Sequence, residues 1–310
     1  MPAAAVPLIP MLGAPTASGK SSAAISLALD LAGLRNIEIV TADAMQVYRG
    51  MDIGTAKPGV SEQQGVPHHL LDLVSPAEPF SVARWVAAAE EVIGEILQRG
   101  ALPLVVGGTG FYLRSLADGL PLVPAADPAV QAQLNRRLES EGLEVLRTEL
   151  AAASAVDAER AGLNPRRVIR ALEILTRTGR APSEFGLSDP RYRFSKLVLL
   201  PEVAELAEPI ARRAETMFAS GLVAEVRDLL EAWPEQLTAT QAIGYKEVVA
   251  HLRGQYSLEQ AVEAVQLATV RYAKRQLTWF RREPGAQQLH GTAAENLPQL
   301  RDWLAGLAVK

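Results

Sequence analysis

The nine residues from Gly13 to Ser21 (GAPTASGKS) constrain this chain more than any other segment, because they place loop backbone, a lysine and a hydroxyl directly after an apolar run. In a phosphate-binding loop, successive N–H groups and the start of the next helix surround an anion, the lysine neutralises its oxygens, and the hydroxyl reaches Mg²⁺. The flanking sequence predicts a buried strand over 7–12 and a helix over 22–31. This order is typical of a phosphate-binding α/β protein.

One position departs from the pattern G-x-x-x-x-G-K-[ST]. Ala14 stands where the pattern has its first glycine, and Gly13 lies one place earlier. Alanine restricts φ where glycine does not, so we expect Ala14 to weaken the loop geometry. The alternative interpretation of the whole segment is a glycine-containing surface turn.

Length and composition describe an ordinary globular protein. The 310 residues are 48% hydrophobic and can bury a large core, as one domain or as a domain with an insertion. The absence of cysteine rules out disulfides and thiolate metal sites. No apolar run reaches the roughly eighteen residues of a membrane span. The apolar start lacks a basic region and runs directly into the phosphate loop, so we interpret the protein as cytoplasmic.

Apolar runs rich in β-branched residues recur at 37–40, 102–106 and 197–200, each followed by loop residues and a helical pattern. Strands that alternate with helices predict a parallel sheet covered on both faces. The intervening residues 118–194 are helical throughout, with prolines at their joints. We therefore predict a P-loop-type α/β core formed by residues 1–117 and 195–310, with an inserted all-helical lobe of residues 118–194.

Two long helical patterns follow, over 206–233 and 258–280. Ser257 with Gln260 three residues later matches a capping box at the start of the second pattern. At about 100° per residue, this second helix has a packing face and a basic face. The expected packing face comprises Leu258, Val262, Val265, Tyr272, Gln276 and Trp279, and the basic face comprises Arg271, Lys274, Arg275, Thr278, Arg281 and Arg282.

Basic residues are unevenly distributed, although the net charge is −4. Residues 164–180 contain five arginines and one glutamate, and residues 241–282 contain seven lysines or arginines and three glutamates. Each segment is a candidate footprint for a polyanion. The alternative for the second segment is a solvated cationic helix face.

Asp43 is the main candidate for chemistry beside the phosphate loop. It follows the predicted strand 37–42, so it is expected at the carboxyl edge of a parallel sheet. A carboxylate there can hold Mg²⁺ or accept a proton from a nucleophile. The alternative is a helix cap before residues 44–46.

Other candidates are weaker when taken alone. Thr109 follows the glycines of a turn after a predicted strand, and Arg213 is a possible cation for phosphate oxygens. His68 and His69 are adjacent and point in different directions, so hydrogen bonding is favoured over a metal pair.

Together these motifs resemble those of the bacterial tRNA dimethylallyltransferases, which attach an isopentenyl group to N6 of the adenosine 3′ of the anticodon. The resemblance covers almost the whole chain. It rests on residues 14–21 (APTASGKS), 43–58 (DAMQVYRGMDIGTAKP), 67–70 (PHHL), 106–110 (VGGTG), 166–172 (RRVIRAL), 241–246 (QAIGYK) and 273–281 (AKRQLTWFR).

The resemblance implies that the loop binds dimethylallyl diphosphate and not a nucleoside triphosphate. Asp43 matches the family's base for the N6 proton, and Lys20, Thr109 and Arg213 would stabilise the departing diphosphate together with Mg²⁺ at Ser21. The diphosphate-binding residues that it implies are Ala14, Pro15, Thr16, Ala17, Ser18, Gly19, Lys20 and Ser21.

The resemblance also implies that the target base leaves the anticodon loop and enters a pocket, while the helical insertion grips the anticodon stem-loop. We expect a monomer with no membrane partner. Val270 stands where an arginine is common in the family, so we expect one phosphate contact of the family to be missing here. The tRNA-binding residues that it implies are Asp43, Ala44, Met45, Gln46, Thr109, Arg166, Arg167, Val168, Ile169, Arg170, Gln241, Ala242, Ile243, Gly244, Tyr245, Lys246, Lys274, Arg275, Gln276, Leu277, Thr278, Trp279, Phe280 and Arg281.

The main alternative is a small-molecule or nucleotide kinase, which shares the phosphate loop, the α/β core and a helical lid. No guanine-reading N-K-x-D motif is present, and a kinase has no evident use for two basic segments so far downstream. An RNA-dependent ATPase switch, in which Asp43 would bind Mg²⁺, is a third alternative.

Overall fold

The computed structural model describes residues 7–234 and 241–309. Its centre is a six-stranded sheet in the order β3-β2-β4-β1-β5-β6, and every neighbouring pair is parallel. This architecture confirms the predicted P-loop-type α/β sheet. The strands are β1 (Leu8–Gly13), β2 (Ile37–Ala42), β3 (His68–His69), β4 (Leu102–Gly107), β5 (Arg193–Leu200) and β6 (Gln287–His290).

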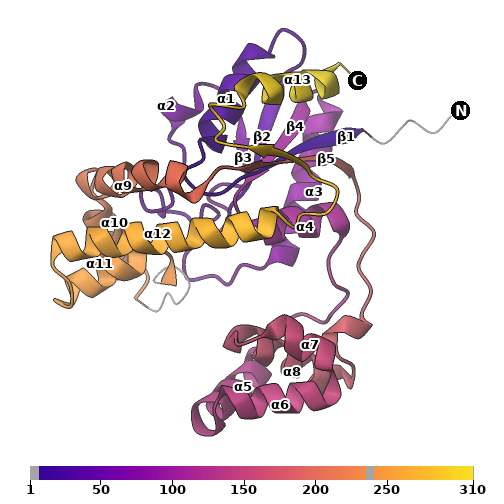
Figure 1. The fold of residues 1–310 in the computed structure, drawn as a ribbon, viewed down its shortest axis with the longest axis vertical. Coiled ribbons are helices and arrows are strands. Elements are labelled where there is room, and N and C mark those ends of the chain that lie inside the picture. Colours follow the sequence, from indigo (N-terminus) through magenta and orange to yellow (C-terminus); the bar gives the residue numbers. More distant parts are fainter. Residues whose placement is uncertain (1–6, 235–240, 310) are drawn as a thin grey trace, which may run out of the picture. The chain divides into compact units, whose positions relative to one another are not determined.

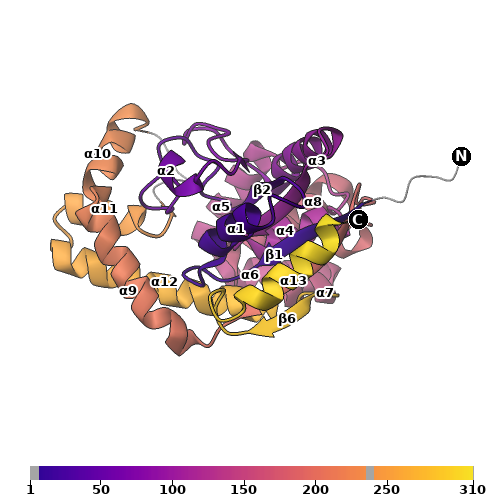
Figure 2. The ribbon, with the colours of Figure 1, turned by 90° about the horizontal axis from the view of Figure 1, so that it is seen from above.

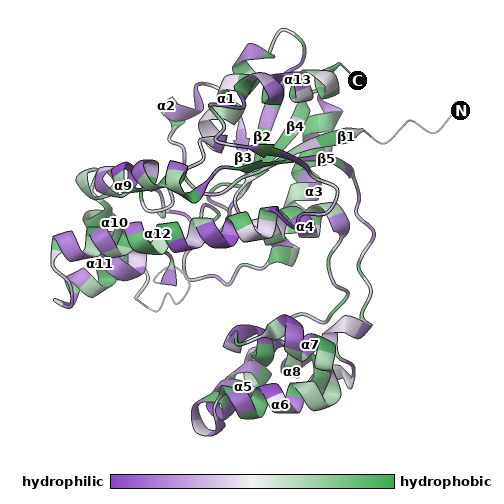
Figure 3. Ribbon diagram, viewed as in Figure 1, coloured by the Kyte–Doolittle hydropathy of each residue, from purple (hydrophilic) through white to green (hydrophobic). Residues whose placement is uncertain are grey.

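Helices cover both faces of the sheet, which explains why its central strands are buried along their whole length and are mostly apolar. All six residues of β2 and all six of β4 are buried. On one face lie α1 (Lys20–Asp30) and α13 (Leu297–Ala308), and on the other lie α3 (Val82–Gln98) and α4 (Gly110–Asp118) (Figures 1 and 2). Hydrophobic residues are concentrated in the strands and on the inner sides of these helices (Figure 3). The short helix α2 (Val60–Gln63) lies in the connection between β2 and β3.

Four helices extend beside the sheet. They are α9 (Val203–Ala219), α10 (Leu222–Ala232), α11 (Tyr245–Leu252) and α12 (Leu258–Phe280). The single helical pattern predicted over 206–233 is therefore wrong, because Gly221 adopts a left-handed conformation with φ of 102° and separates α9 from α10. Such a backbone conformation ends a helix, and glycine adopts it without steric cost.

The capping box predicted at the start of α12 is confirmed, since Ser257 Oγ accepts from Gln260 N at 3.2 Å and Gln260 Oε1 accepts from Ser257 N at 2.8 Å. The predicted packing face is only partly correct. Leu258 is 44% exposed, whereas the buried positions are Ala261, Val265, Ala273, Gln276, Leu277 and Phe280. The helix contacts α9, α11 and β5 along its length, so its buried side does not follow one straight stripe.

Residues 118–190 form a separate compact unit, whereas residues 1–117 and 191–310 form the other. The helices of the smaller unit are α5 (Pro128–Glu141), α6 (Leu143–Ala153), α7 (Ala155–Ala161) and α8 (Pro165–Thr178), followed by the turn η1 (Pro182–Glu184). We expected the insertion to end at residue 194, but the compact unit ends at residue 190 and β5 begins at Arg193.

The helical unit has its own core, which includes Leu134, Leu146, Leu150, Val168 and Leu172. Local sequence fixes its helix ends. For example, α8 begins after Asn164, whose side chain accepts from Arg167 N at 3.3 Å, and has Pro165 in its first turn. Among the described residues, no helix combines the length and apolarity needed to cross a membrane.

Candidate active site

The phosphate loop leaves the carboxyl end of β1 and leads into α1. Ala14 continues the strand direction, since its N–H donates to the Gly107 carbonyl of β4 at 3.2 Å and its side chain is fully buried. The positive φ values of the loop fall instead at Ala17 (63°) and Gly19 (82°). The expectation that Ala14 weakens the loop is therefore wrong, because its position requires no left-handed backbone.

Lys20 and Ser18 carry polar groups in the loop that can bind an anion. Lys20 Nζ donates to the Pro15 carbonyl at 3.2 Å. Burial lowers the pKa of Lys20 to about 8, the nearby Asp43 acts in the opposite direction, and Arg213 lowers it further. Ser18 Oγ is buried and has no hydrogen-bond partner within the described ranges. A bound phosphate would supply the missing acceptor and favour the charged lysine.

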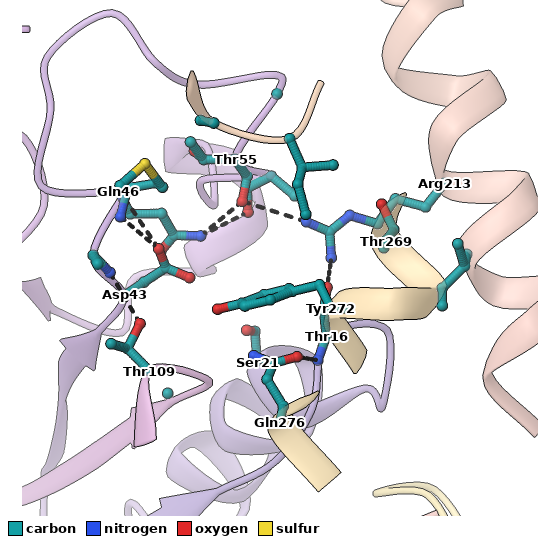
Figure 4. Close-up of a pocket in the computed structure, with 18 of the residues that line it drawn as sticks. Thr16, Ser21, Asp43, Gln46, Thr55, Thr109, Arg213, Thr269, Tyr272 and Gln276 are labelled. Carbon is teal, nitrogen blue, oxygen red and sulfur yellow. Dashed lines mark hydrogen bonds between the residues drawn. The ribbon is translucent and has the colours of Figure 1, made fainter. Parts of the chain in front are cut away.

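A cavity of about 390 Å³ lies beside the loop at the carboxyl edge of the sheet. Its lining includes the cationic side chains of Lys20, Arg213 and Arg275 and the carboxylate of Asp43. Figure 4 shows Asp43 and Arg213 among the residues around it. The structure thus brings together the four residues predicted to carry the chemistry, which are Lys20, Asp43, Thr109 and Arg213.

The two oxygens of Asp43 have different surroundings. Oδ1 accepts from Met45 N at 2.8 Å and from Gln46 N at 3.3 Å, which caps a turn at residues 44–47 and not a helix. Oδ2 accepts no hydrogen bond from the part of the chain that is described. One oxygen therefore fixes the side chain and leaves the other available to a ligand.

Thr109 joins the edge of β4 to the edge of β2, because its Oγ1 accepts from Ala44 N at 3.1 Å. Tyr272 of α12 lines the same space and points its ring across the cavity (Figure 4). Burial raises the pKa of Tyr272, and Asp43 raises it further, so the phenol stays protonated and can donate a hydrogen bond. Sequence reasoning placed Tyr272 only on a packing face.

Arg213 reaches the cavity from α9. Its Nη1 donates to Thr16 Oγ1 at 3.1 Å, and its Nη2 donates to the Thr55 carbonyl at 3.4 Å. Gln46 Nε2 also donates to the Thr55 carbonyl, at 3.1 Å. Thr55 is a site residue that the sequence reasoning missed, although it lies within the segment DIGTAKP that contributed to the resemblance.

Gln276 was predicted as a tRNA contact, but the structure gives it another role. Its side chain is buried, with Oε1 accepting from Thr16 N at 2.8 Å and Nε2 donating to the Gly108 carbonyl at 2.8 Å. It therefore connects the phosphate loop to the glycine turn after β4. The sequence held one signal for this role. Gln276 is a polar residue on the packing side of a helix, and a buried amide needs hydrogen-bond partners.

Several other predicted tRNA contacts do not face solvent. The residues buried in their own units are Gln46, Val168, Ile169, Gly244, Tyr245, Leu277 and Phe280. The apolar spacing within each motif directs most of these residues to the core, so their contact with tRNA stays a prediction that their side chains do not support. The exposed members are Arg166, Arg167, Gln241, Lys246, Lys274, Arg275, Thr278 and Arg281.

Two further predictions concern metal and histidine. Ser21 is exposed at the start of α1 and lines the cavity with Asp43, which gives the hard oxygen donors that Mg²⁺ prefers. No group of three or more metal-binding side chains occurs in the described residues, so water and substrate oxygens would complete such a shell. His68 Nδ1 pairs with the Val66 carbonyl at 2.8 Å and His69 Nε2 with Glu38 at 2.6 Å, as expected for hydrogen-bonding histidines.

A phosphate loop, the cations Lys20 and Arg213 and a free carboxylate oxygen in one cavity are features expected of an enzyme that transfers a group from a phosphorylated donor. A sequence model of the IPP transferase family matches residues 46–283. The chain therefore belongs to the IPP transferase family, and the family resemblance of its motifs is confirmed.

Individual relatives match over nearly the full length. The tRNA dimethylallyltransferase of Thermus thermophilus is 52% identical, over 96% of this chain and 97% of its own, and that of Deinococcus radiodurans is 47% identical, over 94% and 95%. Among solved structures, the tRNA isopentenylpyrophosphate transferase from Bacillus halodurans has a TM-score of 0.70 at 35% identity, covering 97% of this chain and 96% of its own. A eukaryotic dimethylallyltransferase acting on tRNA has a TM-score of 0.75 at 27% identity, covering 96% and 77%.

Proposed function

We propose that this protein transfers a dimethylallyl group from dimethylallyl diphosphate to N6 of the adenosine 3′ of the anticodon in tRNA, and releases diphosphate. The observation that carries the proposal is the shared cavity of Lys20, Asp43, Thr109 and Arg213. Membership of the IPP transferase family and the names of its relatives support a tRNA prenyltransferase over a kinase.

The chain stabilises the leaving diphosphate from two sides. As the bond between C1 of the allyl group and oxygen breaks, its electron pair leaves with the diphosphate, and negative charge collects there. Lys20 and the loop N–H groups face this charge from α1, and Arg213 faces it from α9. Mg²⁺ held near Ser21 would neutralise further charge. Preorganised contacts of this kind each contribute about 10² to 10³ in turnover.

Asp43 serves as the base. The N6 amine is a weak nucleophile because its lone pair is delocalised into the adenine ring, so removal of its proton assists bond formation to C1. Oδ2 of Asp43 takes that proton, while Oδ1 stays bonded to the backbone of residues 45 and 46. Thr109 lies beside Asp43 at the sheet edge, where it can contact the incoming nucleoside.

The tRNA backbone would meet the exposed cations. On α12 and just beyond it, the exposed basic residues are Arg271, Lys274, Arg275, Arg281 and Arg282. Arg275 also lines the cavity, which places phosphate-binding charge beside the chemistry. In the helical unit, Arg166 and Arg167 are exposed and would contact the anticodon stem-loop. We place the reaction in the cytoplasm, where tRNA is used, and expect a monomer.

A donor assay tests the proposal. Incubation with dimethylallyl diphosphate, Mg²⁺ and unmodified tRNA should add the mass of one dimethylallyl group to adenosine, whereas ATP should give no product. Asp43→Asn should abolish alkylation and leave tRNA affinity largely intact, because asparagine can still cap the turn through its carbonyl. Phosphorylation by ATP without prenylation would favour a kinase. A parallel loss of binding and turnover in Asp43→Asn would make Asp43 a positioning residue.

A further inference from the structure

Glu225 of helix α10 holds the loop at residues 52–54 through hydrogen bonds. The carboxylate of Glu225 accepts hydrogen bonds from three successive backbone N–H groups, those of Asp52 at 3.1 Å, Ile53 at 2.7 Å and Gly54 at 3.2 Å. It also accepts from Tyr245 Oη at 2.6 Å. Hydrogen bonds to an ionised carboxylate are among the stronger ones in proteins, so this is a firm anchor for the loop.

The anchored loop is one wall of the cavity. Gly54, Thr55 and Ala56 all line it, and the Thr55 carbonyl accepts from Arg213 and Gln46. A Cβ atom at Gly54 would lie 2.4 Å from the Tyr245 ring, so the ring packs directly on the backbone of this wall. Displacement of residues 52–54 would therefore move groups that face the substrates.

Tyr245 connects Glu225 to a second wall. Residues 241–243 line the cavity immediately before Gly244, and α11 begins at Tyr245. Burial raises the pKa of Tyr245 and the neighbouring Glu225 raises it further, so the phenol remains a donor to the carboxylate. One glutamate thus fixes two wall segments that are almost 190 residues apart in sequence.

Apolar side chains also line the cavity. They are Ile210, Ala214, Met217, Ile243 and Val265. Such a lining suits a short branched hydrocarbon, and the distance between the walls decides how many carbons fit. A rigid wall rejects a longer chain because overpacking forces side chains and backbone to move.

We propose that Glu225 is a positioning residue that holds both walls and so restricts the cavity to a five-carbon prenyl group. This inference rests on the proposed function. Glu225 is not among the residues that line the cavity. It acts through the backbone of residues 52–54 and through Tyr245, and neither contact involves the phosphate loop.

The test compares donors in the full-length enzyme. The ratio of kcat/KM for dimethylallyl diphosphate to that for geranyl diphosphate, its ten-carbon homologue, is measured with one tRNA at a temperature where each variant is folded. In Glu225→Gln the amide would face N–H donors, so we expect this ratio to fall by about tenfold, a typical effect of pocket size on discrimination. Affinity for inorganic pyrophosphate should fall by less than this ratio, because Lys20 and the phosphate loop keep their contacts and only Arg213 bonds to the loop that moves.

Tyr245→Phe removes a single hydrogen bond and should lower the ratio in the same direction by less. The double variant should resemble Glu225→Gln, because Tyr245→Phe removes a hydrogen bond that already depends on the Glu225 carboxylate. Glu231→Gln, an exposed change on the same helix, is the matched control and should leave the ratio unchanged. An unaltered ratio in both Glu225→Gln and Tyr245→Phe would overturn the inference. Failure of the wild-type enzyme to use dimethylallyl diphosphate would overturn the proposed function instead.

Discussion

Lys20 illustrates how a single residue is prepared for an anionic ligand. Its ammonium is placed beside Arg213, away from bulk water, and burial lowers its pKa to about 8. The nearby Asp43, the proposed base, offsets part of this effect. The lysine is thus a cation that a diphosphate would stabilise, because an adjacent negative charge favours the protonated form.

This lowered pKa predicts a pH dependence of ligand binding. Below about pH 8 the ammonium is charged and attracts pyrophosphate. As the pH rises through 8, the free protein loses this proton, and binding then requires proton uptake, so affinity should fall by up to about tenfold per pH unit. Calorimetric titration with inorganic pyrophosphate from pH 7 to roughly 9.5 measures the effect.

Pyrophosphate itself titrates in this range, so the control is Lys20→Arg, whose guanidinium stays charged throughout. The ratio of the two dissociation constants cancels the ionisation of the ligand. A ratio that does not change with pH would contradict the assigned role of Lys20.

At the scale of elements, α12 serves two purposes at once. Its buried side carries Gln276, which bonds to both glycine-containing loops, and its exposed side carries Lys274 and Arg275. Consecutive residues of a helix point about 100° apart, so neighbours in sequence reach different surroundings. The helix therefore places positive charge beside the loops that its other side supports.

Charge reversal on α12 should weaken tRNA binding in a salt-dependent way. Each cation that contacts a phosphate contributes roughly 0.7 to 0.9 to the slope of log affinity against log salt. Lys274→Glu and Arg275→Glu should therefore each lower affinity at low salt and reduce this slope by about 1. Filter binding at four salt concentrations measures it, with the exposed Arg227→Glu on α10 as control. Equal slopes for all variants would place the RNA elsewhere.

Sequence predicted the elements better than the contacts between them. The apolar runs that lead up to Gly13, Asp43 and Gly107 correctly indicated three strands that end at one edge of the sheet. A buried parallel strand can be recognised locally because it is a short continuous run of apolar residues. The bond from Thr16 N to Gln276 joins residues 260 apart, and no local pattern encodes such a partner. Glu225 was missed for the same reason, since its partners are three backbone groups, which carry no sequence signal.

At the scale of the whole molecule, two units have separate cores. The sheet unit is built around residues such as Leu12, Leu104 and Leu199, and the helical unit around Leu146 and Leu150. The helical unit also satisfies its own charges, since the buried Glu173 pairs with Arg170 at 2.8 Å and accepts from Gln131 at 2.8 Å. Units with this degree of internal bonding unfold as separate cooperative blocks.

Scanning calorimetry should therefore show two transitions that respond to different perturbations. Pyrophosphate at about 100 times its dissociation constant should stabilise the sheet unit by about 2.7 kcal/mol and raise only that transition. Leu150→Ala removes a fully buried side chain and should destabilise the helical unit by about 2 to 5 kcal/mol, which lowers only the other transition. Leu163→Ala, an exposed change in the same unit, should move neither. A single transition that shifts with both perturbations would show that the units unfold together, because a shared cooperative block transmits each change to the whole.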